Sequence, residues 1–335
     1  MTNQPTHPKI LVGDGDFVYQ AFDHWHSLPA GVDLVEAVGV ATDSQDRVFV
    51  FNRGRQAINV FDRDGSHLFG WQDGIFTRPH GITIGPDDFL YLCDDRDHTV
   101  HKYTAEGELI WTLGTRGQPS DTGTVEFDFR AIQQAAGPFN QPTNLALAND
   151  GSFYISDGYG NARVHHFSAE AELIRSWGEP GDGPGQFHLP HGIAVDNHQR
   201  VFVADRENSR LQIFSAEGQF LDQWTDVIRP TQVFFDDDNH AFVSELGKRA
   251  GLSSWMQEDL SVSGGRVSVF DSNGQLLARW GGGETPCECG DFFAPHDLCV
   301  DSHGDLYVGE VTISAGGNEG IVPADCATLQ KFVRQ

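Results

Sequence analysis

The sequence predicts an all-β protein, a six-bladed β-propeller closed by an N-terminal strand that completes the last blade. Three observations predict this fold. A unit of about forty residues recurs along the 335-residue chain, and this period is typical of propeller blades. Each unit contains short runs rich in valine, isoleucine and phenylalanine, separated by turn residues. The 38 glycines and 15 prolines suit a chain with many turns. We therefore expect a single domain that spans residues 1–335.

The fourth copy defines the repeating unit. It places four short strand-like runs between Pro190 and Trp224, with turn residues between them. The other copies begin near Val38, Pro79, Pro142, Pro230 and Pro295. The fifth copy carries an insertion at about 247–265, for which two interpretations stay open: a lid over one face or a decoration of the surface.

The last copy is incomplete, and the N-terminal region supplies the missing part. After Leu329–Val333 the chain ends without a fourth run. The alternating run Phe17–Phe22 belongs to no copy of its own. Pairing these two runs would complete the sixth blade and leave no open sheet edge, so the ring is expected to close in this way.

Composition limits the possible partners and compartment. There are 22 Lys plus Arg residues against 48 Asp plus Glu, a formal net charge of -26, which disfavours nucleic acid. Most of the acidity is expected on a solvated surface, and part of it is available to calcium. Met1–Pro8 has no basic start or apolar run of a secretory signal, and no window has the roughly 20 apolar residues of a membrane span. We expect a cytoplasmic protein with no membrane partner.

The five cysteines are an odd set in which only Cys287 and Cys289 lie close together. A single Cys-x-Cys lacks the second pair that a structural zinc site requires. The sequence therefore favours free thiols.

Three copies of the repeat carry a histidine at the same position. His80, His191 and His296 each follow the proline that opens copies two, four and six, while Asn144 and Thr231 are assigned to the corresponding places in copies three and five. Equivalent positions of a propeller repeat lie around one axis, so histidines on alternate blades are expected to converge at one mouth of the central channel. A single Pro-His-Gly would be an incidental turn. Three converging neutral imidazoles with an open fourth position instead predict a catalytic zinc.

The loop after the second strand of each blade should lie on the same face as the histidines. Three of these loops contain Arg53, Tyr159 and Arg206. The arginines could hold a substrate carboxylate, and Tyr159 could act as a general base if a cation stabilises its phenolate. Ordinary turn chemistry, with the arginines paired to acidic residues of the repeat, explains the same residues equally well.

The repeats resemble NHL repeats, and copies two to four resemble the catalytic domain of peptidyl-α-hydroxyglycine α-amidating lyases. The motifs are Tyr154–Arg163, Pro190-His191 and Val203–Arg210, and the likeness extends from about Val38 to Glu310. The resemblance implies zinc on the three histidines, Tyr159 as the base for the substrate hydroxyl, Arg53 on the substrate and Arg206 in support. It also implies a structural calcium ion in the channel, bound by the Asp297 carboxylate and the carbonyls of Val40 and Ile82.

The activity implied is elimination from a carbinolamide: the C–N bond breaks, and an amide and glyoxylate or a related carbonyl acid leave without a redox cofactor. The sequence departs from the family in several places. Gly160 stands where secreted animal members have a disulfide cysteine, Ala294 replaces a methionine, and copy five has added residues. Neither a monooxygenase domain nor a secretory signal is expected. These departures favour a small α-hydroxy acid amide, such as a ureidoglycolate-like compound, over a peptide precursor.

Two other function classes stay open. A metal-dependent hydrolase, lactonase or hydratase could use the same scaffold, although sugar lactonase propellers generally bind one metal through Glu, Asn and Asp. A noncatalytic NHL propeller could bind protein or RNA on one face, but it would not require histidines on alternate blades. The sequence leaves the oligomeric state open.

Overall fold

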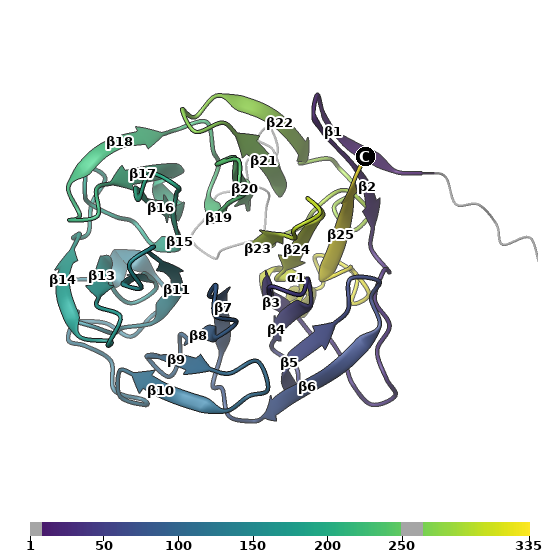
Figure 1. The fold of residues 1–335 in the computed structure, drawn as a ribbon. Coiled ribbons are helices and arrows are strands. Elements are labelled where there is room, and N and C mark those ends of the chain that lie inside the picture. The colour runs from purple at the N-terminus through teal and green to yellow at the C-terminus, as the bar shows by residue number, and fades with distance from the viewer. Residues whose placement is uncertain (1–8, 249–263) are drawn as a thin grey trace, which may run out of the picture.

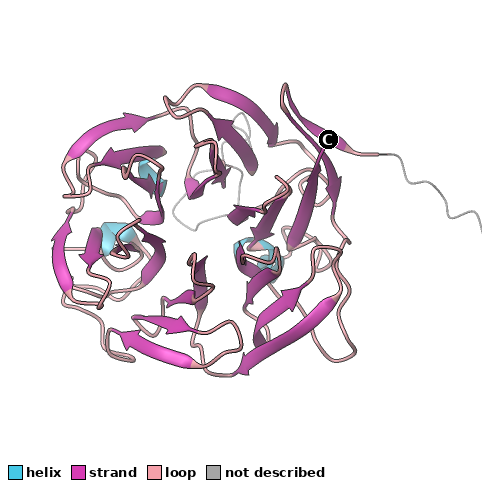
Figure 2. Ribbon diagram, in the orientation of Figure 1, coloured by secondary structure: helices cyan, strands magenta, loops and turns pink. Residues whose placement is uncertain are grey.

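The computed structural model describes residues 9–248 and 264–335. In these residues the strands form six antiparallel sheets arranged around a central channel, as Figure 1 shows. Strands account for nearly all of the regular structure in Figure 2, and the helices are single turns: η1 (Phe129–Ala131), η2 (Arg206–Asn208), α1 (Thr312–Ala315) and η3 (Gly317–Glu319). The predicted all-β, six-bladed propeller is confirmed.

The strands of each blade follow one another along the chain, and the first strand of each blade lies at the channel. Blades 1 to 3 contain β3 (Ala37–Thr42), β4 (Val48–Asn52), β5 (Gln56–Phe61) and β6 (His67–Asp73); β7 (Pro79–Ile84), β8 (Leu90–Asp94), β9 (Thr99–Tyr103) and β10 (Leu109–Leu113); β11 (Pro142–Leu147), β12 (Phe153–Asp157), β13 (Arg163–Phe167) and β14 (Leu173–Trp177). Blades 4 to 6 contain β15 (Pro190–Val195), β16 (Val201–Asp205), β17 (Arg210–Phe214) and β18 (Phe220–Trp224); β19 (Pro230–Phe235), β20 (Ala241–Glu245), β21 (Arg266–Phe270) and β22 (Leu276–Gly281); β23 (Pro295–Val300), β24 (Leu306–Glu310) and β25 (Leu329–Arg334).

The sixth blade is completed from the N-terminal region. Strand β2 (Phe17–Phe22) pairs antiparallel with β25, and Ala21 lies opposite Phe332. The predicted closure of the ring is therefore confirmed. A further strand that the sequence analysis did not identify, β1 (Leu11–Asp14), pairs with the outer edge of β2 and makes this the only five-stranded sheet among the described residues.

The inner and middle strands of every blade are buried, and aromatic rings fill the space between blades. The ring centroid of Phe202 in blade 4, for example, lies 5.1 Å from that of Trp224 in the same blade and 4.8 Å from that of Phe235 in blade 5. The turns between strands are fixed by aspartates of the repeat: Asp196 accepts hydrogen bonds from the backbone N–H groups of His198 and Arg200. The repeat therefore encodes both the packing between blades and the turns.

Blade 6 contains a disulfide that corrects the expectation of free thiols. Cys287 and Cys326 are bonded, with their Cα atoms 5.0 Å apart. They are 39 residues apart in sequence. The fold brings together the connection between β22 and β23, which contains Cys287, and the loop between β24 and β25, which contains Cys326. Cys93, Cys289 and Cys299 are free. Because disulfides persist mainly in oxidising compartments, this bond gives no support to the predicted cytoplasmic location.

Two further expectations concern membrane-spanning segments and the insertion in copy five. No helix in the described part of the chain has the length and apolar character needed to cross a bilayer. Strand β20 ends at Glu245 and β21 begins at Arg266, so the insertion lies where the repeat placed it; its residues 249–263 are outside the described residues, and neither a lid nor a surface decoration can be assigned.

Candidate active site

Three histidines meet at one mouth of the channel. His80, His191 and His296 are the second residues of β7, β15 and β23, the inner strands of alternate blades. One ring nitrogen from each lies within 4.8 Å of the others, and each pair of ring centroids is 4.7 Å apart. All three are at most 5% exposed. The predicted convergence is therefore present in the structure.

The other ring nitrogen of each histidine is fixed by the next blade. Nδ1 of His80, His191 and His296 lies 2.7 Å from the carbonyl oxygens of Thr143, Thr231 and Val38, respectively. A carbonyl oxygen only accepts, so Nδ1 carries the proton and Nε2 presents a lone pair to the channel axis.

These contacts also correct one repeat assignment. In blade 3 the histidine position is occupied by Thr143, which follows the strand-opening proline, and not by Asn144, which is one residue further along.

The electrostatic environment keeps the three imidazoles neutral. Burial lowers the pKa of each histidine well below 6.5, and neighbouring imidazoles or arginines lower it further. Three neutral nitrogen donors whose lone pairs face one another repel unless a cation lies between them. The donor set, its burial and its anchoring by carbonyls fit a zinc site with an open position.

Tyr159 reaches the histidines from the loop after β12. Its hydroxyl oxygen lies 3.2 Å from Nε2 of both His80 and His191 and accepts a hydrogen bond from Arg206 Nη1 at 3.3 Å. Gly158 allows this position, because a Cβ there would stand 2.0 Å from the carbonyl oxygen of Pro190. The loop therefore packs directly on blade 4, next to His191.

Both predicted arginines lie on the same face and are held by acidic residues. Arg53 Nη1 donates to Glu36 at 2.8 Å and its Nε donates to the carbonyl of Pro79 at 3.1 Å, whereas its buried Nη2 has no hydrogen-bond partner among the described residues. Arg206 Nε donates to Glu207 at 2.8 Å. The two interpretations of these arginines are compatible: each is ion-paired, and each still borders the cavity in front of the histidines.

The chain matches the NHL repeat family model at residues 139–167 and 187–214. It is 33% identical over 296 residues to NHL repeat-containing protein 3 of Mus musculus, covering 81% of this chain and 76% of that protein. The chain belongs to the family of NHL repeat-containing protein 3.

Other relatives of this NHL-repeat protein carry enzyme names. It is 29% identical over 265 residues to peptidyl-alpha-hydroxyglycine alpha-amidating lyase 1 of Drosophila melanogaster, covering 74% of this chain and 45% of the lyase. The chain thus spans less than half the length of that relative. Among solved structures, a gluconolactonase from Xanthomonas campestris superposes with a TM-score of 0.63 over 99% of both chains at 14% identity, which shows a shared fold.

The cavity in front of the histidines includes residues that the sequence analysis did not select. It measures about 220 Å³ and is lined by Arg53, Tyr159, Arg206 and His296 together with Arg78, Phe127 and Arg229. Arg78 and Arg229 each stand directly before the proline that opens an inner strand, so a comparison of that one repeat position would have found both. Phe127 lies in the long loop between β10 and β11, where no repeat signal exists.

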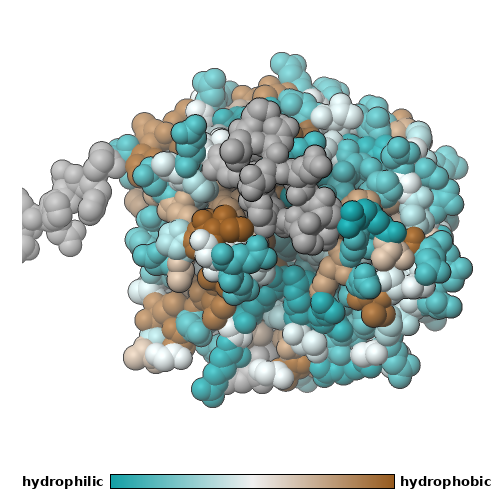
Figure 3. Space-filling model, turned by 180° about the vertical axis from the view of Figure 1, so that it is seen from behind, coloured by the Kyte–Doolittle hydropathy of each residue, from teal (hydrophilic) through white to brown (hydrophobic). Residues whose placement is uncertain are grey.

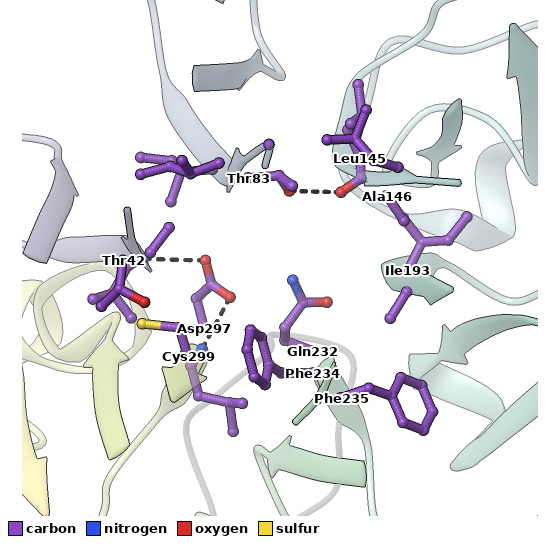
Figure 4. Close-up of a pocket in the computed structure, with 18 of the residues that line it drawn as sticks. Thr42, Thr83, Leu145, Ala146, Ile193, Gln232, Phe234, Phe235, Asp297 and Cys299 are labelled. Atoms are coloured by element: carbon purple, nitrogen blue, oxygen red, sulfur yellow. Dashed lines mark hydrogen bonds between the residues drawn. The ribbon is translucent and has the colours of Figure 1, made fainter. Parts of the chain in front are cut away.

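The residues of the implied calcium site lie one layer deeper in the channel of this NHL-repeat propeller. Figure 4 shows Asp297 and Gln232 pointing into a cavity of about 430 Å³ whose wall includes Val40 and Ile82. Asp297 accepts hydrogen bonds from the N–H groups of Val40 at 3.2 Å and Leu298 at 2.9 Å. Burial raises the pKa of Asp297 to about 8 despite these hydrogen bonds. A cation beside it would keep this carboxylate ionised, so the residues fit the implied ion.

Proposed function

We propose that this protein is a metal-dependent carbon–nitrogen lyase that splits a small carbinolamide into an amide and glyoxylate or a related carbonyl acid. One observation carries the proposal: three neutral imidazole nitrogens converge within 4.8 Å, and the Tyr159 hydroxyl lies 3.2 Å from two of them. The amidating lyase name of the Drosophila relative supports the reaction class. The cavity of about 220 Å³ favours a small substrate over a long peptide.

His80, His191 and His296 would hold zinc, which when bound would polarise the substrate hydroxyl as a Lewis acid. Tyr159, reacting as the phenolate, would take the proton of that hydroxyl onto its phenolic oxygen and become a neutral phenol. Arg206, which donates to this oxygen, would stabilise the phenolate before the transfer. The hydroxyl-bearing carbon then becomes a carbonyl as its C–N bond breaks. The nitrogen keeps the electron pair of that bond and takes up a proton, so the products are a primary amide and a carbonyl acid.

Arg53 would bind the carboxylate of the α-hydroxy acid half. Its Nη2 is a buried donor that finds no partner in residues 9–248 and 264–335, and a substrate carboxylate at this point would satisfy it. Ion pairing to Glu36 fixes the guanidinium, so little side-chain freedom is lost on binding. In the deeper layer, Asp297 with the carbonyls of Val40 and Ile82 would hold the structural calcium ion.

The experiment that tests the proposal measures glyoxylate release by purified protein from a panel of α-hydroxy acid amides, with sugar lactones assayed alongside. Glyoxylate release that is lost in His80→Ala and strongly reduced in Tyr159→Phe is expected. Turnover of lactones alone would favour the hydrolase. Full activity in Tyr159→Phe would remove the tyrosine from its role but leave the metal in place. No turnover by a protein that holds no transition metal would favour a noncatalytic binding propeller, as the name of the mouse relative allows.

A further inference from the structure

The reaction cavity is lined by four arginines in a protein that is acidic as a whole. Arg53, Arg78, Arg206 and Arg229 line it, and no aspartate or glutamate is among its described lining residues, although the chain as a whole has a formal net charge of -26. Charges of one sign inside a concave, low-dielectric site raise the local concentration of the opposite ion. Glu36, Asp95 and Glu207 pair with these arginines from outside the lining, so the guanidinium groups, and not the carboxylates, face the cavity. This arrangement points to an anionic ligand.

Two of these arginines border a second cavity. A neighbouring space of about 400 Å³ lies between blades 1 and 2, and it shares Arg53, Arg78 and Ser314 with the reaction cavity. Ser314 belongs to the single-turn helix α1 of blade 6, and its hydroxyl accepts a hydrogen bond from Arg53 Nη1 at 3.2 Å. The three shared residues stand where the two cavities meet, so each of them borders both.

Arg78 is the more accessible cation at this junction. Its side chain is 26% exposed, compared with 11% for Arg53. Its Nη1 donates to Asp95, which is fully buried, and its guanidinium lies 4.7 Å from the ring centroid of Phe127 and 5.7 Å from that of Tyr159. One carboxylate and two rings therefore fix the guanidinium while part of it faces the cavities. Such a fixed fork is suited to bind a carboxylate.

Phe127 also contacts a second guanidinium, that of Arg96. The guanidinium of Arg96 lies 3.8 Å from the Phe127 ring centroid. Figure 3 shows the face opposite to that seen in Figure 1: much of it is hydrophilic, with hydrophobic patches between, and the residues that are not described are grey.

We propose that Arg78 binds a second anionic group, carried by the amide half of the substrate, where the two cavities join. The inference rests on the proposed lyase function, in which Arg53 binds the carboxylate of the α-hydroxy acid half. The substrate class is then a dianionic carbinolamide: an N-acyl-α-hydroxyglycine whose acyl group ends in a carboxylate. Cleavage of its C–N bond gives glyoxylate and the monoamide of a dicarboxylic acid, with no other reactant required.

The test compares substrates of equal size that differ in one charge. N-succinyl-α-hydroxyglycine and N-succinamoyl-α-hydroxyglycine differ only by a terminal carboxylate against a terminal amide, and malonyl and glutaryl pairs vary the reach. Wild-type protein is expected to favour the carboxylate member by about tenfold or more in kcat/KM, the effect of one charge-assisted hydrogen-bonded pair, with the difference mainly in KM. Equal turnover of both members in every pair would overturn the subsite and leave the lyase standing.

The variants are chosen so that the protein keeps its charge balance. Arg78→Gln alone leaves Asp95 buried without a partner, so Arg78→Gln/Asp95→Asn removes both charges together, and Arg78→Lys keeps the charge without the fork. The double variant is expected to lose the preference for the charged member, whereas Arg78→Lys keeps part of it. Arg175→Gln, at an exposed position of the outer strand β14, is the matched control and should behave as wild type. A preference that persists in the double variant would contradict the assignment.

If no substrate in the panel releases glyoxylate, the lyase proposal fails. Binding measurements then test whether Arg78 binds an anionic group. Calorimetry with glutarate and with its monoamide then compares a dianion with its monoanionic isostere. Tighter binding of glutarate to wild type, lost in the double variant, keeps the anion subsite. Equal binding of both compounds overturns it.

Discussion

Gly158 allows Tyr159 to reach the histidines, and Gly158→Ala tests that role. A Cβ at this position would stand 2.0 Å from the carbonyl oxygen of Pro190. Carbon and oxygen in weak contact are normally about 3.3 Å apart, so the overlap is roughly 1 Å. The neighbour is backbone at the start of β15 and cannot rotate away. We therefore expect the Tyr159 loop to move by about 1 Å, with a loss of about 1–3 kcal/mol in the free energy of unfolding.

A shift of this size should affect catalysis more than metal binding. A displacement of about 1 Å in a positioning element can reduce a rate by about a hundredfold. The three histidines belong to inner strands, so metal content should stay close to that of wild type. The assays are urea denaturation, metal content by mass spectrometry and glyoxylate release. Gly137→Ala is the control, because a Cβ there meets nothing within 4 Å. If Gly158→Ala matches Gly137→Ala in both stability and rate, the proposed packing of this loop is wrong.

Three further predictions concern the metal, the disulfide and a buried acid. Wild-type protein should hold about one zinc per chain. A metal analysis of His191→Ala should find this zinc lost, because only two of the three imidazoles remain to bind it. Cys326→Ser should lower the free energy of unfolding by about 4 kcal/mol in denaturation without reductant, since Cys287 and Cys326 close a 39-residue loop; an equal loss with reductant present would contradict this. Burial raises the pKa of Glu310 to about 8, so the folded state holds this proton more tightly than the unfolded state, and stability should fall as pH rises from about 4.5 to 8. The midpoint temperature of thermal unfolding should depend less on pH across this range in Glu310→Gln than in wild type. An equal dependence on pH in both proteins would refute the assignment.

The sequence predicted the parts of the site that the repeat positions. His80, His191 and His296 occupy one repeat position, so rotation about the axis brings them together whatever the local details are. The closing run Phe17–Phe22 was predicted for a similar reason, because it was the only strand-like run that the sixth copy could still use. Tyr159 was placed on the right face because it follows the second strand of its blade.

The parts that were missed depend on backbone details within a copy. The backbone conformation of the residue before each strand-opening proline differs between copies. At Gln141, Leu189 and Arg229 the backbone is left-handed, with φ of 64°, 69° and 49°, whereas Arg78 has no positive φ. Arg78 and Arg229 nevertheless both line the cavity, so the backbone at this repeat position differs between two copies that place an arginine in the same site. The Cys287–Cys326 pairing was missed because Cys287 lies in the connection between β22 and β23, whereas Cys326 lies in the long loop between β24 and β25, and the repeat does not place these two segments relative to each other.

The histidine site depends on closure of the ring. Each imidazole is anchored by a carbonyl from the following blade, and for His296 that blade is the first one: its Nδ1 donates to Val38 at 2.7 Å, across the seam between the two ends of the repeat array. One residue further, Asp297 accepts the N–H of Val40 across the same seam. His296 therefore has its anchoring carbonyl only when blade 6 packs against blade 1. A cation held by all three histidines would bind the closed ring alone, so metal affinity and closure stabilise each other by linkage.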